Sequence, residues 1–196
     1  TKQYLVQTLE VTLDLLHGAA EDDTALYLYR LALFHEDMHI EAFAYMSQTL
    51  GLDTGLLPPL ATIVPREPLL FPATLWELGS APGGFVFDNE RSRHEVPVPE
   101  FEIDAQPVTW AQYCEFVEDG GYDAPALWSV QGRAWLQAQQ RRTPRHVDQM
   151  RHGVLQHRFG KLMRVPVAQP AMHVSWFEAQ AWCAWAGRRL PTEVEW

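Results

Sequence analysis

The chain has 196 residues, of which 47% are hydrophobic and 12% aromatic, so it can build a core in one large domain or two small ones. Its formal net charge of -10 argues against nucleic-acid and anionic-membrane partners, because both require a basic surface. The sequence contains no apolar run of about 18 residues, no basic leader, and no disulfide framework, since Cys114 and Cys183 are its two cysteines. We therefore expect a cytoplasmic protein with no membrane partner; the sequence sets no oligomeric state.

The first quarter of the chain has the pattern of two helices. Apolar residues recur at helical spacing over residues 4–16, and Gly18 follows as a stop. Residues 22–24, Asp-Asp-Thr, supply N-cap chemistry for a second helix over about 25–50. Apolar residues surround that helix almost completely near 26–34, which predicts burial in a bundle. We expect the other bundle helices to come from chain upstream of this sequence.

The rest of the chain changes character twice. Residues 53–73 carry five prolines and are predicted to form an extended linker. From residue 74 the elements are short and mixed, so the domain prediction is a partial helical metal-binding bundle at 1–52, the linker, and an irregular domain at 74–196. In that domain we expect strands at 74–78, 93–97 and 101–105, helices at 109–118, 124–140 and 176–186, and a basic solvated loop at 141–164, a flap over a cleft.

The most informative stretch reads His-Glu-Asp-Met-His-Ile-Glu at residues 35–41. Positions i and i+4 of a helix project from one face, so His35 and His39 can reach a single cation. The residues near that face are largely apolar, and imidazoles pointed into a core need a partner, which a metal supplies. The spacing predicts that both histidines are metal ligands.

The neighbouring carboxylates leave alternatives open. The string also matches the His-Glu-x-x-His signature of zinc metalloproteases, in which Glu36 would be the general base, but no His-x-x-Gly-x-x-His continuation follows. Glu41 can orient an imidazole, or form a salt bridge with Arg30 or another bundle residue. A structural role for Glu36 and Glu41 is favoured over direct ligation.

Two further stretches carry a family resemblance. Residues 84–90 read Gly-Phe-Val-Phe-Asp-Asn-Glu and are followed by Arg93-His94; residues 173–196 run from His-Val-Ser-Trp-Phe-Glu-Ala to Gly-Arg-Arg-Leu-Pro-Thr-Glu-Val-Glu-Trp. The second stretch closely resembles the signature of the formylglycine-generating-enzyme-like domain, which is related to C-type lectins. Preceded by a helical His-x-x-x-His-x-Glu module, the whole chain resembles the ergothioneine-type sulfoxide synthases and their selenoneine synthase relatives.

The resemblance implies an α+β fold, with a DinB-like helical-bundle segment followed by a C-type-lectin-like, formylglycine-generating-enzyme-type domain that is incomplete at its C-terminus. It implies a three-histidine iron(II) site, Fe(II) being the cofactor, to which His35 and His39 contribute. The third histidine and the catalytic acid or phenol are expected outside this chain. The implied reaction forms a carbon–chalcogen bond at the imidazole C2 of hercynine (Nα-trimethylhistidine), using O2 and a thiol or selenium donor. Three neutral imidazoles leave sites open on an octahedral metal, and an acidic or aromatic pocket suits a quaternary ammonium.

One departure from the family pattern bears on the donor. Typical ergothioneine synthases read His-Glu-Gln-Gln-His, and the Gln before the second histidine contacts the imidazole substrate. Asp37 and Met38 stand at the two Gln positions here, and Met38 cannot make that hydrogen bond well. This favours the selenoneine synthase branch with a selenosugar donor. An ergothioneine-type synthase with a cysteine-derived thiol is the alternative, and a non-catalytic metal-stabilised binding module is the third.

Other candidates receive mainly structural interpretations. Asp88 and Asn89 form either a turn or part of a substrate cleft. His94 and His173 are expected to be hydrogen-bonded structural residues, and both cysteines to be buried packing residues that give no support to a sulfatase-activating role. Four tryptophans are expected in the core: Trp176, Trp182, Trp185 and Trp196.

Overall fold

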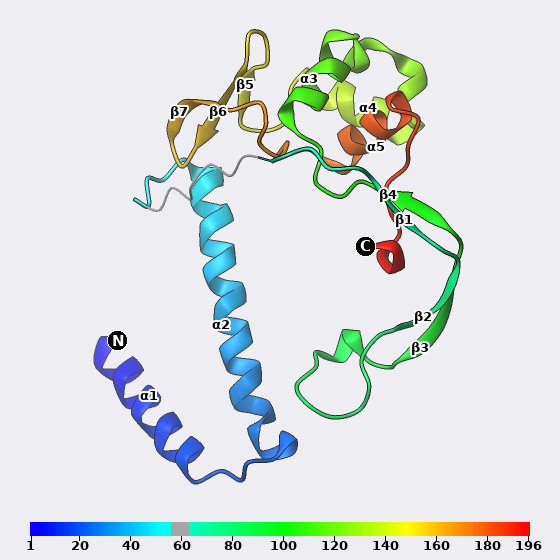
Figure 1. Cartoon of the computed structure of the whole chain (residues 1–196). Helices are drawn as coiled ribbons and strands as arrows, with labels where there is room; N and C mark the ends of the chain where they lie inside the picture. Colours follow the sequence, from blue (N-terminus) through cyan, green and yellow to red (C-terminus); the bar gives the residue numbers. More distant parts are fainter. Residues whose placement is uncertain (56–62) are drawn as a thin grey trace. The chain divides into compact units, whose positions relative to one another are not determined.

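The computed structural model describes residues 1–55 and 63–196 (Figure 1). The chain forms two compact units, each built from two separate stretches. Unit 1 consists of Thr1–Tyr45 and Leu75–Val96, and unit 2 of Met46–Thr74 and Pro97–Trp196. The mixture of helices and small sheets confirms the α+β prediction. No helix in the described part of the chain has the length and apolarity needed to cross a membrane.

Two helices open unit 1, as their periodicity predicts. Helix α1 spans Lys2–His17 and α2 spans Asp23–Leu50 (Figure 1). Asp22 begins α2, because its Oδ1 accepts hydrogen bonds from the backbone N–H groups of Thr24 and Ala25 at 3.0 and 2.8 Å. Most apolar side chains of both helices remain exposed within the described residues. The described residues therefore do not bury α2 in the way that its sequence predicts.

A two-stranded ribbon completes unit 1. Strand β2 (Thr74–Leu78) pairs with β3 (His94–Val98), close to the predicted strands at 74–78 and 93–97. Gly79 follows β2 with a φ of +88°, and a Cβ there would lie 2.8 Å from the carbonyl oxygen of Ser92. Glycine is required at this point because the two chain segments approach too closely for a side chain. A loop containing the 3-10 helix η1 (Asp88–Glu90) connects the strands.

Unit 2 begins with a second small sheet. Strand β1 (Leu69–Phe71) pairs antiparallel with β4 (Phe101–Ile103), and the rings of Phe71 and Phe101 stack at 5.1 Å between centroids. The end of the predicted linker is thus a strand rather than free extended chain. Residues 56–62 of that linker lie outside the described residues.

The helices of unit 2 follow their capping signals. Helix α3 spans Trp110–Glu118 and α5 spans Trp176–Trp185, with capping boxes at Thr109 and Ser175. The helix predicted for residues 124–140 begins later, because Pro125–Leu127 forms the 3-10 helix η3 and Ser129 caps α4 (Val130–Gln139). Two other 3-10 helices are η2 (Gly121–Asp123) and η4 (Glu193–Glu195).

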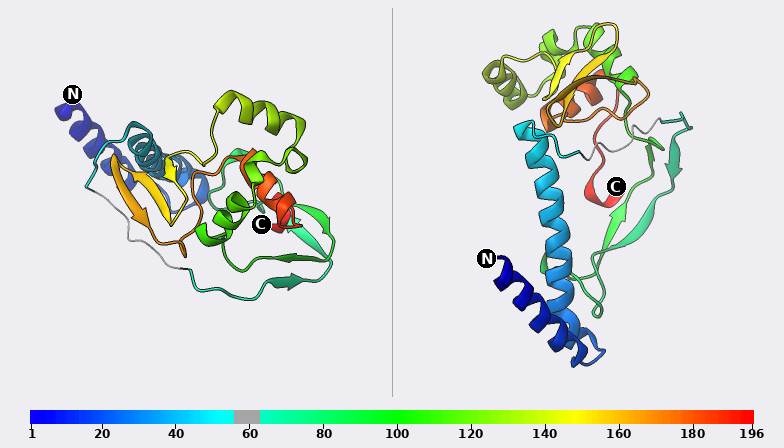
Figure 2. Two further views of the ribbon diagram at one scale, coloured as in Figure 1. Left: turned by 90° about the horizontal axis from the view of Figure 1, so that it is seen from above. Right: turned by 90° about the vertical axis from the view of Figure 1, so that its left-hand side faces the viewer.

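The prediction of a solvated loop at 141–164 is wrong. This stretch contains an antiparallel sheet, β5 (Val147–Gln149), β6 (Val154–Arg158) and β7 (Lys161–Val165), whose strands lie side by side in Figure 2. Residues 154, 156 and 158 of β6 are buried, while 155 and 157 are half-buried. In β7 the exposed Arg164 stands between Met163 and Val165, which pack inward, whereas in β6 the charged Arg158 is itself buried on the same side as Val154 and Gln156.

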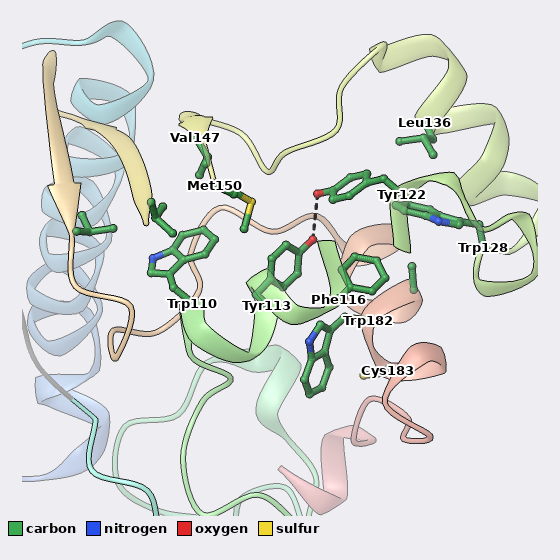
Figure 3. Close-up of a cluster of buried hydrophobic side chains, with 13 residues drawn as sticks. Trp110, Tyr113, Phe116, Tyr122, Trp128, Leu136, Val147, Met150, Trp182 and Cys183 are labelled. Atoms are coloured by element: carbon green, nitrogen blue, oxygen red, sulfur yellow. Dashed lines mark hydrogen bonds between the residues drawn. The ribbon is translucent and has the colours of Figure 1, made fainter. Parts of the chain in front are cut away.

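An aromatic core holds unit 2 together (Figure 3). The rings of Tyr113, Tyr122 and Trp185 lie 5.5, 5.7 and 6.0 Å from the ring of Phe116 between centroids. The Tyr113 and Tyr122 hydroxyl oxygens are 3.0 Å apart, and the Tyr122 hydroxyl donates to Glu178 Oε1 at 2.6 Å. Burial, followed by the charge of Glu178, raises the pKa of Tyr113, and burial also raises the pKa of Tyr122. Both phenols are therefore neutral hydrogen-bonding groups inside the core.

The tryptophan prediction is correct in part. Trp182 is buried and Trp185 packs against the core, but Trp176 is 59% exposed and Trp196 is 91% exposed. Of the cysteines, Cys183 is buried, while Cys114 is half-buried, with its Sγ directed at the Met150 carbonyl oxygen at 3.8 Å.

Candidate metal centre

The two histidines of the 35–41 motif converge on one face of α2. Their Nε2 atoms are 3.3 Å apart, and their ring centroids are separated by 4.4 Å. Both side chains are exposed, so a ligand can reach the two nitrogens. The structure thus places His35 and His39 as the helical spacing predicts.

The spacing of the two nitrogens fits one metal ion. Two nitrogens bound to one ion at about 2.1 Å lie about 3.0 Å apart at adjacent octahedral positions and about 3.4 Å apart at tetrahedral ones. The observed 3.3 Å between the Nε2 atoms falls between these two values. Within residues 1–55 and 63–196, no group of three or more His, Cys, Asp or Glu side chains comes together as a metal site. His35 and His39 therefore fit two ligands of an ion whose other ligands are not among the described residues.

The residues between and after the histidines have separate environments. Met38 is 53% exposed, on the turn that joins His35 to His39. Arg30 forms an ion pair with Asp23, Nη1 to Oδ1 at 2.7 Å, and it lies about three helical turns from Glu41 along α2, too far for the two side chains to pair. The salt-bridge alternative for Glu41 with Arg30 is therefore wrong.

An aromatic cluster lies beside the motif. The ring of Phe34, which directly precedes His35, stacks on Phe85 at 5.0 Å and meets Phe87 edge-on at 6.4 Å between centroids. Tyr27, seven residues earlier on the same helical face, lies 5.3 Å from Phe85. The Arg91 guanidinium lies 5.8 Å from the centre of the Tyr27 ring. The loop between β2 and β3 therefore covers this face of α2.

This cluster is missing from the sequence interpretation. Its signals were available, since Tyr27 and Phe34 are seven apart on a helix and Phe85 and Phe87 alternate in an extended segment. Pairing them requires a contact between segments about 50 residues apart, which local periodicity does not encode.

A carboxylate ties the loop to the helix. Asp23 Oδ2 accepts a hydrogen bond from the backbone N–H of Gly84 at 2.6 Å, while its Oδ1 faces Arg30. The hydrogen bond from Arg30, and then that from Gly84, lowers the pKa of Asp23. Asp23 is therefore ionised at neutral pH and joins two segments of unit 1.

Asp88 and Asn89 form a local turn. The Asn89 backbone N–H donates to Asp88 Oδ1 at 3.1 Å at the start of η1. Neither side chain has a hydrogen bond to His35 or His39 in the described part of the chain. The observed contact agrees with the turn interpretation, and their proximity to substrate stays a prediction.

The remaining histidines belong to other surroundings. His94 Nδ1 is 2.9 Å from the Ser92 carbonyl oxygen, a hydrogen bond that the structural interpretation anticipates. The His173 ring instead packs edge-on against His146 at 4.9 Å, and both residues have left-handed backbone conformations. Burial, then the charges of His146, Arg145 and Arg158, lowers the pKa of His173 to about 4. His173 is thus neutral at physiological pH.

A separate cleft of about 740 Å³ lies within unit 2, along β4 and the end of α5. Trp182 and Cys183 line it, and Arg188 near its edge forms an ion pair with Asp104. None of the predicted site residues lines this cleft. Both arginines that line it are paired with carboxylates, Arg188 with Asp104 and Arg189 with Glu195, so it offers no convergent nitrogen ligands comparable to the histidine pair.

Comparison with known families agrees with the C-terminal signature. The family described as the sulfatase-modifying factor enzyme 1-like domain matches residues 64–196. The chain belongs to this family. The match covers most of unit 2 and the β2–β3 part of unit 1. The histidine motif precedes the matched residues.

Individual relatives extend over the helices as well. The hercynine oxygenase of Mycolicibacterium smegmatis is 37% identical over 209 aligned positions, covering 100% of this chain and 46% of its own length. That of Mycobacterium tuberculosis is 34% identical, covering 100% of this chain and 47% of its own length. The chain thus spans about half the length of these relatives.

Membership of the sulfatase-modifying factor enzyme 1-like family does not by itself assign a reaction. A mouse relative named inactive C-alpha-formylglycine-generating enzyme 2 is 34% identical over 125 positions, which cover 56% of this chain and 39% of its own length. Burial raises the pKa values of Cys114 and Cys183, which disfavours reactive thiolates. The histidine pair, and not the cysteines, is therefore the feature that points to a reaction.

Proposed function

We propose that this chain is part of a non-haem iron(II), O2-dependent synthase that acts on hercynine. The observation that carries the proposal is the convergence of His35 and His39, whose Nε2 atoms lie 3.3 Å apart. Two relatives named hercynine oxygenase align with the whole chain, including these helices. Neutral imidazoles suit iron(II) and leave coordination positions for O2 and substrates.

The histidines have one task in this proposal, which is to hold the ion. His35 and His39 provide two neutral nitrogen ligands on a rigid helix, and a third histidine is expected from another helix of the full-length protein. When bound, iron(II) would supply the activation of O2. The exposed side of the pair leaves room for a small-molecule substrate.

The overall reaction joins a chalcogen to the imidazole ring. The C2–H bond of hercynine and the Se–H or S–H bond of the donor are lost, and a C–Se or C–S bond forms. O2 takes up the two hydrogens and four electrons in all: one of its oxygen atoms leaves as water, and the other stays on the chalcogen as the sulfoxide or its selenium counterpart. No nucleic acid, membrane or protein partner is needed for this chemistry.

We favour a selenium donor, a selenosugar, because of Met38. The thioether of Met38 stands on the turn between the two ligands and cannot donate a hydrogen bond to the imidazole substrate. It is soft and polarisable, which suits contact with a selenium atom better than a glutamine amide does. A cysteine-derived thiol donor, as in the ergothioneine-type synthases, is the second candidate.

Turnover by full-length protein tests the proposal. The purified, iron-loaded enzyme is mixed with hercynine and a donor, and O2 consumption and the product mass are followed. We expect hercynine-dependent O2 consumption that is abolished in His35→Ala and retained in His17→Ala, since His17 lies on α1 with its Nδ1 beside the Leu13 carbonyl oxygen. No turnover with any imidazole substrate, with zinc bound instead of iron, would favour a non-catalytic metal-stabilised module.

A donor comparison tests the selenium preference separately. The same enzyme is supplied with a selenosugar in one reaction and γ-glutamylcysteine in another. We expect the selenium product, and expect Met38→Gln to improve the thiol reaction relative to the selenium one. Product from the thiol alone contradicts the preference for selenium while leaving the hercynine proposal intact.

A further inference from the structure

The loop at residues 83–91 packs its aromatic rings on the part of α2 that directly precedes the histidine pair. Its Phe85 and Phe87 rings pack on Phe34, and Phe34 directly precedes His35. Met38 lies four residues after Phe34, so it continues the same stripe of α2 one turn further. The covered part of α2 therefore ends where the metal-binding turn begins.

This loop needs a tether to keep its position. Gly83 and Gly84 both have positive φ, at +106° and +66°, and two successive glycines allow many other backbone conformations. The Asp23 carboxylate fixes one of these by accepting the Gly84 N–H at 2.6 Å, while Arg30 holds its other oxygen at 2.7 Å. At the far end of the loop, Arg91 lies over the Tyr27 ring at 5.8 Å.

We propose that Asp23 is a positioning residue for the histidine site. It sets the register of the 83–91 loop on α2, and so the place of the Phe85 and Phe87 rings on the part of α2 that directly precedes the histidine pair. The inference rests on the proposed function of the histidine pair. It predicts that loosening the tether changes substrate binding more than metal binding, because Asp23 contacts the loop and not the ligands.

The preceding residue offers a matched control. Asp22 is also a carboxylate at the start of α2, but its Oδ1 accepts from the backbone N–H groups of Thr24 and Ala25 and caps the helix. Asp22→Ala therefore weakens the helix start without releasing the loop. Asp23→Asn keeps an oxygen for Gly84 but loses the charge that pairs with Arg30.

The first readout is amide hydrogen exchange of the loop in the full-length, iron-loaded protein. We expect the exchange rate within 83–91 to rise about fivefold in Asp23→Ala. This is the size of effect that the loss of one exposed charge-assisted hydrogen bond and one ion pair produces. The rise should be smaller in Asp23→Asn, and the loop should be unchanged in Asp22→Ala. If Asp23→Ala fails to fold, Arg30→Gln removes the ion pair alone and should give the smaller rise. Unchanged loop exchange in the folded variants overturns the proposal.

The second readout compares substrate binding with iron(II) binding in the same variant. In Asp23→Ala we expect the KM for hercynine to rise about fivefold, by the same scale, while iron(II) affinity stays within about twofold of the wild type. Faster loop exchange with unchanged KM and kcat overturns the positioning role. If the wild type neither binds iron nor consumes hercynine, the proposed function fails and the positioning role fails with it, while the exchange data still show whether the tether exists.

Discussion

The two units use their apolar residues in opposite ways. Unit 2 packs Trp110, Tyr113, Phe116 and their neighbours into a core, whereas the helices of unit 1 expose leucines and aromatics along most of their length. The charged and metal-binding groups of the proposed site nevertheless lie on unit 1. The buried core and the proposed metal site thus lie in different regions, so substitutions in each should have separable effects.

Truncating one phenylalanine in each unit gives the largest expected contrast. Phe116 is fully buried against three aromatic rings, whereas Phe43 of α2 is 64% exposed. We expect Phe116→Ala to lower the free energy of unfolding by about 3–5 kcal/mol and Phe43→Ala by about 0.5 kcal/mol or less. Urea unfolding of the 196-residue chain, followed by far-ultraviolet circular dichroism, measures both. Equal losses would show that the two units do not differ in packing.

A hydrogen-bond deletion sharpens the same contrast. Tyr122→Phe leaves the buried Glu178 carboxylate without its 2.6 Å donor, and should cost about 1.5–3 kcal/mol of unfolding free energy. Tyr45→Phe removes a hydroxyl from an exposed position on α2 and should be nearly neutral. The same unfolding experiment compares them. A neutral Tyr122→Phe would mean that the carboxylate finds another donor.

A pH dependence located in unit 2 gives the third comparison. The pKa of His173 lies near 4 in the folded protein and 6.5 in its ordinary state, so between these values the unfolded chain binds a proton that the folded chain does not. Protonation of His173 should therefore leave the free energy of unfolding unchanged above about pH 6.5, and should lower it as the pH falls from there toward about 4. His173→Asn should flatten this decrease, because asparagine tolerates the left-handed backbone and does not titrate. Unfolding free energies near neutral pH and at about pH 5 provide the test, and an unchanged decrease in the variant contradicts it.

The sequence predicts local features well and long-range ones poorly. The cap at Ser175, the bounds of α2 and the convergence of His35 and His39 follow from spacing and hydrogen-bonding chemistry within a few residues. The sequence did not predict the β5–β6–β7 sheet, because arginines and a lysine interrupt the alternation of apolar and polar residues in its strands. The contact between Asp23 and Gly84 spans 61 positions, so no local pattern predicts it.

The sequence also did not predict which tryptophans are exposed. Trp176 and Trp196 lie in the same signature stretch, residues 173–196, as the buried Trp182. The sequence does not distinguish the two exposed tryptophans from the buried one. Burial depends on which segments pack around a helix, and a helix that is apolar on all sides leaves that choice open.

Iron binding by the full-length protein tests the central claim most directly. Anaerobic titration with iron(II) is compared between the wild type, His35→Ala, His39→Ala and the control His17→Ala. The account predicts one iron per chain in the wild type and the control, and a loss of affinity of at least about tenfold in each motif variant, the scale on which disturbed ligation acts. Unchanged iron(II) affinity in both His35→Ala and His39→Ala would contradict it.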